Sequence, residues 1–163
     1  MSEIHHYIDG KSAEGTSGRW GDVYNPATGE HSRRVAFATA GDVDKAVRAA
    51  AAAFPGWAAT PPLTRARILF KFRGLLEREA GDLARLITDE HGKVLSDAAG
   101  EVTRGTEVVE FACGIPHLLK GEFTEQVGRG IDSWSLRQPL GVCVGITPFN
   151  FPAMVPMWMF PVA

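Results

Sequence analysis

The sequence predicts an α/β protein, and two features of its hydrophobic pattern lead to that prediction. Between residues 42 and 113, apolar side chains recur at the spacing of amphipathic helices. Nearer the end of the chain, residues 142–146 (Val-Cys-Val-Gly-Ile) form an apolar run with β-branched residues and no polar alternation. Such a run is typical of a parallel strand that is covered on both faces. Helices combined with a buried parallel strand indicate the α/β class.

The first forty residues are predicted to form short strands joined by turns. An Asp-Gly turn at residues 9–10 follows one short strand, and residues 25–29 (Asn-Pro-Ala-Thr-Gly) form a second turn ahead of the apolar residues 35–37. We expect these strands to make a small antiparallel arm on the surface. Residues 5–6 (His-His) have no further ligands at metal-binding spacing, so we interpret them as a solvated pair and predict no metal site.

The middle of the chain predicts a series of helices with definite ends. The first covers residues 42–57, and the Pro-Gly pair at 55–56 is its expected stop. The second begins near Thr64 and is expected to break near residues 81–82 (Gly-Asp). A shorter helix then follows, and Gly92 is its expected carboxyl cap.

The last long helix is expected over residues 96–113. Its predicted buried stripe consists of Ala98, Val102, Val109 and Cys113. Arg104 lies on another face of this helix, with Glu101 and Glu107 three residues away on either side. From the pattern alone, the favoured interpretation is an exposed ion pair that contributes little to stability.

The apolar run ends abruptly at residues 147–152 (Thr-Pro-Phe-Asn-Phe-Pro). We expect a strand over 141–146, a tight turn that contains Asn150, and a helix that begins near Pro152. Ligands of open parallel sheets bind beyond the carboxyl ends of the strands, and an uncharged amide at that place is suited to hold a developing oxyanion. The alternative is that Asn150 only caps the helix, and spacing alone favours this alternative.

Composition excludes some classes of partner and location. The chain has 163 residues, 45% of them hydrophobic, and a formal net charge of -2, so we expect neither nucleic-acid binding nor electrostatic membrane attachment. Residues 141–163 carry no charge, but four prolines argue against a membrane-spanning helix. Cys113 and Cys143 lack metal-binding spacing and are expected to be buried, reduced thiols. The absence of a signal core or an amphipathic presequence predicts a bacterial-type cytoplasmic protein.

Three segments near the end of the chain resemble the aldehyde dehydrogenase superfamily. They are residues 138–142 (Gln-Pro-Leu-Gly-Val), 146–152 (Ile-Thr-Pro-Phe-Asn-Phe-Pro) and 155–161 (Val-Pro-Met-Trp-Met-Phe-Pro). Within the superfamily, the chain is most similar to the CoA-acylating methylmalonate-semialdehyde dehydrogenases. Phe149, where the superfamily usually has Trp, is one feature that points to this branch. The resemblance covers essentially the whole chain, which is far shorter than a complete family member and is therefore interpreted as an amino-terminal fragment.

The resemblance implies an incomplete Rossmann-like NAD-binding domain made of residues 1–120 and 139–163, with the catalytic domain absent. It assigns residues 121–138 to part of a β oligomerisation arm. A Gly-Arg-Gly turn at 128–130 and the alternation around Trp134 agree with strands that leave the main body. The chain has no G-x-G-x-x-G motif, so NAD binding is inferred from the resemblance.

The resemblance also implies roles for four residues. Thr147 and Phe149 would line the nicotinamide end of NAD, and Asn150 would help to hold the oxyanion formed from the aldehyde. Arg104 lies in a segment similar to the one whose arginine binds the substrate carboxylate, a task for which a planar guanidinium is suited.

The implied reaction is the NAD-dependent oxidation of methylmalonate or malonate semialdehyde, with loss of the carboxylate as CO2, to propanoyl-CoA or acetyl-CoA, as in valine and inositol degradation. A cysteine thiolate attacks the aldehyde, and CoA takes the acyl group as co-substrate. The nucleophile and the general base are expected beyond Ala163, so the fragment alone is expected to be inactive and the complete protein to be a homo-oligomer. Two alternatives stay open: a fragment of an ordinary hydrolytic aldehyde dehydrogenase, and a non-catalytic oligomerisation module.

Overall fold

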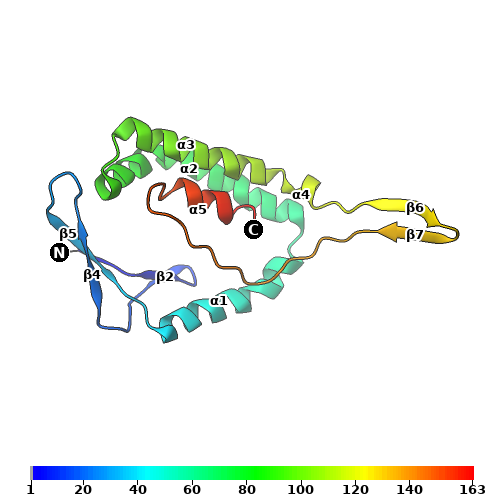
Figure 1. Cartoon of the computed structure of the whole chain (residues 1–163), viewed down its shortest axis with the longest axis horizontal. Helices are drawn as coiled ribbons and strands as arrows, with labels where there is room; N and C mark the ends of the chain where they lie inside the picture. The colour runs from blue at the N-terminus through cyan, green and yellow to red at the C-terminus, as the bar shows by residue number, and fades with distance from the viewer. Residues whose placement is uncertain (1) are drawn as a thin grey trace.

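The computed structural model describes residues 2–163 and combines helices with short strands, which confirms the α/β class (Figure 1). The amino-terminal strands lie at one end of the molecule, a hairpin projects from the other end, and the helices connect the two ends. In chain order the elements are β1 (Ser2–Ile4), β2 (His6–Ile8), β3 (Lys11–Ala13), β4 (Trp20–Tyr24), β5 (His31–Ala36), α1 (Ala40–Ala59), α2 (Pro62–His91), α3 (Leu95–Cys113), α4 (Ile115–Leu118), β6 (Phe123–Gly128), β7 (Ile131–Trp134) and α5 (Met154–Met159).

The amino-terminal strands form two small sheets. Strands β2 and β3 pair antiparallel through the predicted turn, in which Asp9 and Gly10 have φ angles of 55° and 73°. Positive φ at both central residues is the requirement of a type I′ hairpin turn, which Asp-Gly meets. Strand β5 pairs antiparallel with β4 but parallel with β1, where Ser2 lies opposite Arg33. The prediction of a purely antiparallel arm was therefore wrong, because the first residues return to pair with a strand from much later in the chain.

Helix α1 begins at a reciprocal cap. The Thr39 hydroxyl accepts a hydrogen bond from the Asp42 N–H at 3.1 Å, and the Asp42 carboxylate accepts one from the Thr39 N–H at 2.9 Å. The Thr16 hydroxyl also donates to Asp42, at 2.8 Å. Caps of this kind stabilise a helix by about 1 kcal/mol. Asp42 therefore joins the segment before β4 to the start of α1.

The end of α1 differs from the prediction, because the helix continues through Pro55 as far as Ala59. Thr60 has an extended ψ of 125°. The next residue is Pro61, and a residue that precedes proline is driven out of the helical region. Loss of one backbone hydrogen bond at Pro55 therefore does not end the helix. The prolines after Thr60 end it.

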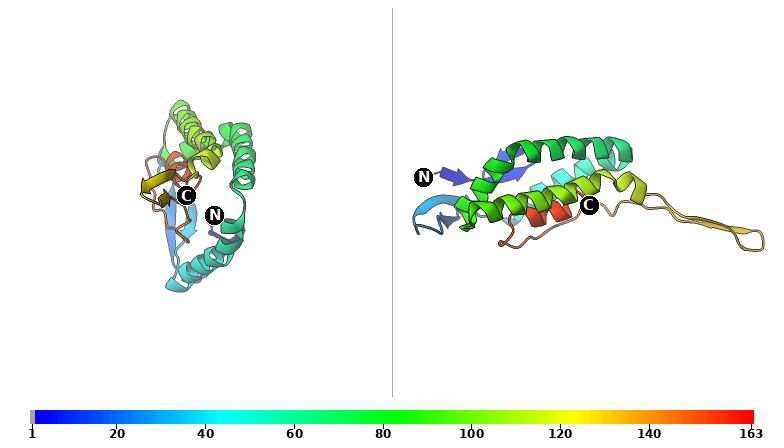
Figure 2. Two further views of the ribbon diagram at one scale, coloured as in Figure 1. Left: turned by 90° about the vertical axis from the view of Figure 1, so that its right-hand side faces the viewer. Right: turned by 90° about the horizontal axis from the view of Figure 1, so that it is seen from above.

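Helix α2 is continuous, so the predicted break at residues 81–82 was wrong. A glycine inside a helix costs only about 1 kcal/mol, and α2 packs along its length against α3 (Figure 2). The other predicted end was correct: Gly92 has φ 82°, and its N–H donates to the Thr88 carbonyl at 2.8 Å. This left-handed cap turns the chain into α3.

The core lies between α2, α3 and α5. The predicted stripe of α3 is buried as expected, and it consists of Ala98, Val102, Val109 and Cys113. Two clusters form around it, one with Ala84 and Ile87 and the other with Leu76 and Met157. Full burial of an aliphatic side chain contributes about 1.5–3 kcal/mol, so these contacts hold the helical layer together.

The turn between β4 and β5 contacts the corner between α2 and α3. A Cβ atom on Gly92 would lie 3.0 Å from Cγ of Pro26, and Arg33 forms an ion pair with Glu90. Within the turn, the Gly29 N–H donates to the Asn25 carbonyl at 2.8 Å. These contacts give residues 25–29 a structural role, because their turn joins the amino-terminal strands to the helices.

Strands β6 and β7 form an antiparallel hairpin that projects away from the helices, as expected (Figures 1 and 2). The Gly-Arg-Gly turn lies at its tip, with Gly130 at φ 73°. The apolar side chains of the hairpin are exposed, and they include Phe123, Val127, Ile131 and Trp134.

The predicted buried strand at residues 141–146 is absent from the structure of residues 2–163. The segment is extended but pairs with no other strand, and Val144 and Ile146 are 80% and 91% exposed. Cys143, expected to be buried, is exposed as well. The physical reason is that a parallel strand exists only as part of a ladder, and the described residues supply no neighbouring strand. In Figure 1 this segment crosses the space between α1 and α5.

Candidate functional site

The candidate site is built around residues 147–153, which we call the Asn150 turn. It joins the extended segment to α5, and it contains the predicted residues Thr147, Phe149 and Asn150. Asn150 and Phe149 are exposed, and Thr147 is partly buried. The prediction that Asn150 lies in a turn before a helix is confirmed, although α5 begins at Met154 rather than near Pro152.

The alternative in which Asn150 caps this helix is wrong. The residue at the cap position of α5 is Ala153, which has no side-chain acceptor. The acceptor comes instead from α3: Oε1 of Glu101 receives hydrogen bonds from the N–H groups of Ala153, at 2.8 Å, and Met154, at 3.1 Å. Free N–H groups at a helix start need such partners. Glu101 therefore attaches the start of α5 to the middle of α3.

Glu101 is fully buried and ionised. Its second oxygen, Oε2, pairs with the ammonium group of Lys93. Burial alone would raise the pKa of Glu101, but the Lys93 ammonium and the N–H groups of Ala153 and Met154 together hold this pKa below its usual value. A buried carboxylate is tolerated only when it is paired and hydrogen-bonded in this way.

Lys93 connects Glu101 to the Asn150 turn. It directly follows the Gly92 cap, and its side chain is 13% exposed. Its Nζ donates to the backbone carbonyl of Asn150 at 2.6 Å and lies 4.0 Å from the ring centroid of Phe151. One ammonium group therefore contacts the carboxylate, the backbone at residue 150 and the aromatic ring at residue 151.

Arg104 does not form the expected ion pair. Among residues 2–163 it makes no salt bridge with Glu101 or Glu107, and Glu101 points into the protein toward Lys93. The guanidinium carbon of Arg104 lies 5.6 Å from the ring centroid of Phe151. The structure thus brings Arg104 to the residue next to Asn150, at the exposed side of the turn.

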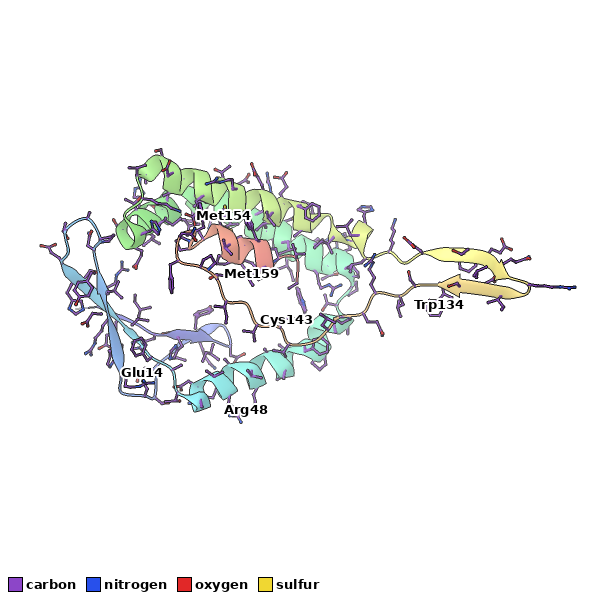
Figure 3. The ribbon with its side chains drawn as sticks, in the orientation of Figure 1. Glu14, Arg48, Trp134, Cys143, Met154 and Met159 are labelled. Carbon is purple, nitrogen blue, oxygen red and sulfur yellow. The ribbon has the colours of Figure 1, made fainter. Side chains whose placement is uncertain are left out.

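Helix α5 approaches α3 closely at Gly105. A Cβ atom there would lie 3.1 Å from Sδ of Met157 and 3.3 Å from Cα of Met154. In Figure 3, Met154 and Met159 lie on α5 beside α3, and Cys143 lies on the extended segment. A residue without a side chain is needed at this contact, so Gly105 brings α5 within reach of Glu101.

Sequence reasoning missed Lys93, Glu101 and Gly105. A signal was present, because residues 98, 101, 105 and 109 follow each other at spacings of three and four and share one face of α3. Two of these positions, Ala98 and Val109, were predicted to be buried. A glutamate on that face needs a buried partner, and a glycine there indicates a close approach.

Other kinds of site find no support in the part of the chain that the structure describes. No three or more His, Cys, Asp or Glu side chains are gathered as metal ligands, and none of the helices has the length and hydrophobicity needed to cross a bilayer. One cleft among residues 2–163 is lined by the end of α1, the start of α2, the end of α3 with α4, and residues 137–140 and 160–163, and none of Arg104, Thr147, Phe149 and Asn150 lines it.

These features define part of an α/β domain, with a helical layer and a turn that carries Thr147 and Asn150 at the carboxyl end of an apolar extended segment, where such domains bind ligands. The chain belongs to the aldehyde dehydrogenase family, whose sequence model matches residues 13–163.

Similar proteins come from bacteria and mammals. The chain is 52% identical over 163 residues to malonate-semialdehyde dehydrogenase of Pseudomonas aeruginosa, covering 100% of this chain and 33% of that protein. It is 46% identical over 157 residues to the human mitochondrial methylmalonate-semialdehyde/malonate-semialdehyde dehydrogenase [acylating], covering 96% of this chain and 29% of that protein. The chain thus spans about a third of the length of these relatives.

A solved structure is similar to this chain in both fold and sequence. A Sinorhizobium meliloti 1021 protein with the provisional name methylmalonate-semialdehyde dehydrogenase, in complex with NAD, superposes with a TM-score of 0.95 at 55% identity. The match covers 99% of this chain and 33% of that chain. These similarities confirm the resemblance to the semialdehyde branch, whereas the roles of Arg104, Thr147, Phe149 and Asn150 stay predictions.

Proposed function

We propose that this chain is part of an NAD-dependent, CoA-acylating dehydrogenase that oxidises methylmalonate or malonate semialdehyde. The observation that supports it is the arrangement around Phe151. The cationic Arg104 contacts this ring from α3, and Asn150 directly precedes it in the turn. A substrate with a carboxylate at one end and an aldehyde at the other needs a cation and an oxyanion-stabilising amide on the same side of a site.

In this proposal each predicted residue has one task. Arg104 binds the substrate carboxylate through its planar guanidinium, and the Asn150 amide donates to the oxyanion that develops on the aldehyde oxygen. Thr147 and Phe149 are accessible on the same turn and would contact the nicotinamide end of NAD. NAD, when bound, accepts the hydride. We assign the nucleophilic cysteine and the general base to the remaining two thirds seen in the relatives. Cys113 is unsuited to be the nucleophile, since it is buried and burial raises the pKa of its thiol.

The proposal extends to CoA and to assembly. Transfer of the acyl group to CoA, with loss of the substrate carboxylate as CO2, would give propanoyl-CoA or acetyl-CoA, and the human relative's name includes the word acylating. We assign residues 1–120 and 139–163 to the NAD-binding domain and residues 121–138 to an oligomerisation arm. The projecting hairpin with exposed Phe123 and Trp134 would fit a contact between copies of the chain. A cytoplasmic location stays a prediction from the sequence.

The test uses a chimera in which this chain replaces the matching third of the Pseudomonas aeruginosa relative. We expect NADH formation from malonate semialdehyde that requires or is accelerated by CoA, with acetyl-CoA identified by mass spectrometry. The intact relative, assayed in parallel, is the positive control. A free acid as the only product, at a rate that CoA does not change, would favour the hydrolytic alternative. A folded chimera that oxidises no aldehyde would favour the non-catalytic module.

A further inference from the structure

We propose that Lys93 and Glu101 are positioning residues that hold the Asn150 turn in place against α3. The expected effect of this pair on turnover rests on the proposed function of Asn150. Its expected effect on the position of the turn does not. Neither residue is expected to touch substrate or NAD. They act through the backbone of residues 150–154, which both of them contact.

Glu101 holds one end of the turn. The start of α5 has no cap from its own segment, because Ala153 stands at the cap position. Both of its first N–H groups, on Ala153 and Met154, donate to a single oxygen of Glu101, which is 52 residues earlier in the chain than Ala153. The direction in which α5 leaves the turn is therefore set by one carboxylate on α3.

Lys93 holds the other end of the turn. An ammonium group has three donors and no acceptor, and here one donor reaches Glu101 while another reaches the carbonyl of Asn150. The same charge lies over the ring of Phe151. Lys93 contacts the backbone carbonyl of Asn150 and not its side chain. It therefore fixes the position of residue 150 without engaging the side-chain amide.

A stabilising role alone does not account for this arrangement. Apolar residues of the same size pack in a helix interface about as well as a buried ion pair, so a buried pair is weak support for stability. The specific property of this pair is its direction. Oε1 of Glu101 contacts the N–H groups of Ala153 and Met154, and Nζ of Lys93 contacts the carbonyl of Asn150. On the other side of the turn, the extended segment has no paired neighbour in the structure of residues 2–163.

The experiment removes the pair without leaving a buried charge. In the chimera, Lys93→Met/Glu101→Leu removes both polar groups, whereas Lys93→Met/Glu101→Gln retains an oxygen that can accept from the Ala153 N–H. The matched control is Arg73→Met/Glu110→Gln. It removes another ion pair between α2 and α3, with an Nε to Oε2 distance of 3.4 Å, together with the Arg73–Glu77 pair within α2. Thermal melting establishes that each variant is folded.

The first readout is hydrogen exchange of peptides that cover residues 148–157. We expect exchange to become about tenfold faster in the Leu double variant, because the N–H groups of Ala153 and Met154 lose their acceptor. The Gln double variant should be protected more than the Leu variant, and the control should match the parent. Unchanged exchange in the Leu variant, or an equal increase throughout α2 and α3, would overturn the proposal.

The second readout is turnover of malonate semialdehyde. A displaced catalytic group costs about a hundredfold in rate, so we expect kcat to fall by about that factor in both double variants, with the KM for NAD little changed. Faster exchange with an unchanged kcat, where Asn150→Ala does lower kcat, would overturn the positioning role. If Asn150→Ala itself leaves kcat unchanged, the assigned function of Asn150 fails, while the exchange result still decides whether the pair holds the turn.

Discussion

Gly105 and Met157 are in direct contact across the interface of α3 and α5, and no space for a Cβ atom remains between them. An added Cβ would overlap the methyl group of Met157 and lie 3.3 Å from the Cα of Met154. The methionine side chain can move, but the backbone of α5 cannot move without changing its hydrogen bonds to Glu101. The separation of these helices is therefore set by the absence of a side chain at position 105.

Substitution of Gly105 by alanine is expected to destabilise the chimera. Alanine gains about 1 kcal/mol of helix propensity, whereas overpacking costs about 1–3 kcal/mol, so the net loss should be up to about 2 kcal/mol. Gly100→Ala on the same helix is the matched control, because a Cβ there meets nothing within 4 Å. It should stabilise by up to about 1 kcal/mol. Urea unfolding measures both effects, and the same shift for both variants would contradict the packing argument.

Arg104→Leu should impair the chimera only toward substrates that carry a carboxylate. Loss of a charge-assisted bidentate contact should reduce transition-state stabilisation, calculated from kcat/KM for malonate semialdehyde, by about 2–4 kcal/mol. Propanal has no carboxylate, so its kcat/KM should change little. Stability should change by less than about 1 kcal/mol, because Arg104 is exposed and its contact with Phe151 is weak. Equal losses for both aldehydes would mean that Arg104 supports the fold.

Asn150→Ala should reduce turnover without reducing stability. Removal of one oxyanion donor typically lowers kcat by about 10²–10³-fold, whereas an exposed side chain without hydrogen bonds among residues 2–163 contributes little to folding. Asn150→Asp keeps the shape of the side chain but places a negative charge beside the oxyanion, so it should lose at least as much activity. Steady-state kinetics and thermal melting of the two variants check this prediction. A kcat close to that of the parent chimera would contradict the assigned role.

Asp42 should make the stability of the chimera depend on pH in the acidic range. The N–H and hydroxyl of Thr39 and the hydroxyl of Thr16 hold the pKa of Asp42 well below its usual value. A pKa that is lower in the folded than in the unfolded state stabilises the protein above the unfolded value of about 3.9, and this contribution is lost as the pH falls further. The difference in unfolding free energy between parent and Asp42→Asn should be constant from about pH 5 to 8 and shrink below about pH 4. Urea unfolding at several pH values measures it, and a difference that stays the same at pH 3 would contradict the assignment.

The 163-residue chain by itself should form no NADH from malonate semialdehyde and CoA, because the proposal assigns the nucleophile to the remaining part of the relatives. It should also self-associate, since Leu140, Ile146 and Phe149 are each more than nine-tenths exposed. Absorbance at 340 nm and analytical ultracentrifugation are the measurements, with the chimera as the active control. Steady turnover by the chain alone would contradict the assignment.

Local features of the sequence were enough for much of the fold. The Asp9-Gly10 turn, the Gly92 cap and the buried stripe of α3 each follow from a conformational or periodic preference that acts within a few residues. The same is true of the turn that contains Asn150. The predicted helix ends at 55–56 and 81–82 failed. Helix α1 continues through Pro55 to the prolines after Thr60, and in α2 the packing against α3 outweighs the cost of about 1 kcal/mol for a glycine inside a helix.

The sequence by itself determined the presence of the helices, the hairpin turns and the family, since periodicity and motif do not depend on distant partners. Only the tertiary structure decided where the charges near the candidate site go. Spacing placed Arg104 between two glutamates, but α3 turns Glu101 inward to Lys93 and to the start of α5, and Arg104 is left against Phe151. The physical reason is that a buried carboxylate requires several hydrogen-bond donors at once, and here they come from residues 93, 153 and 154, which only folding brings together.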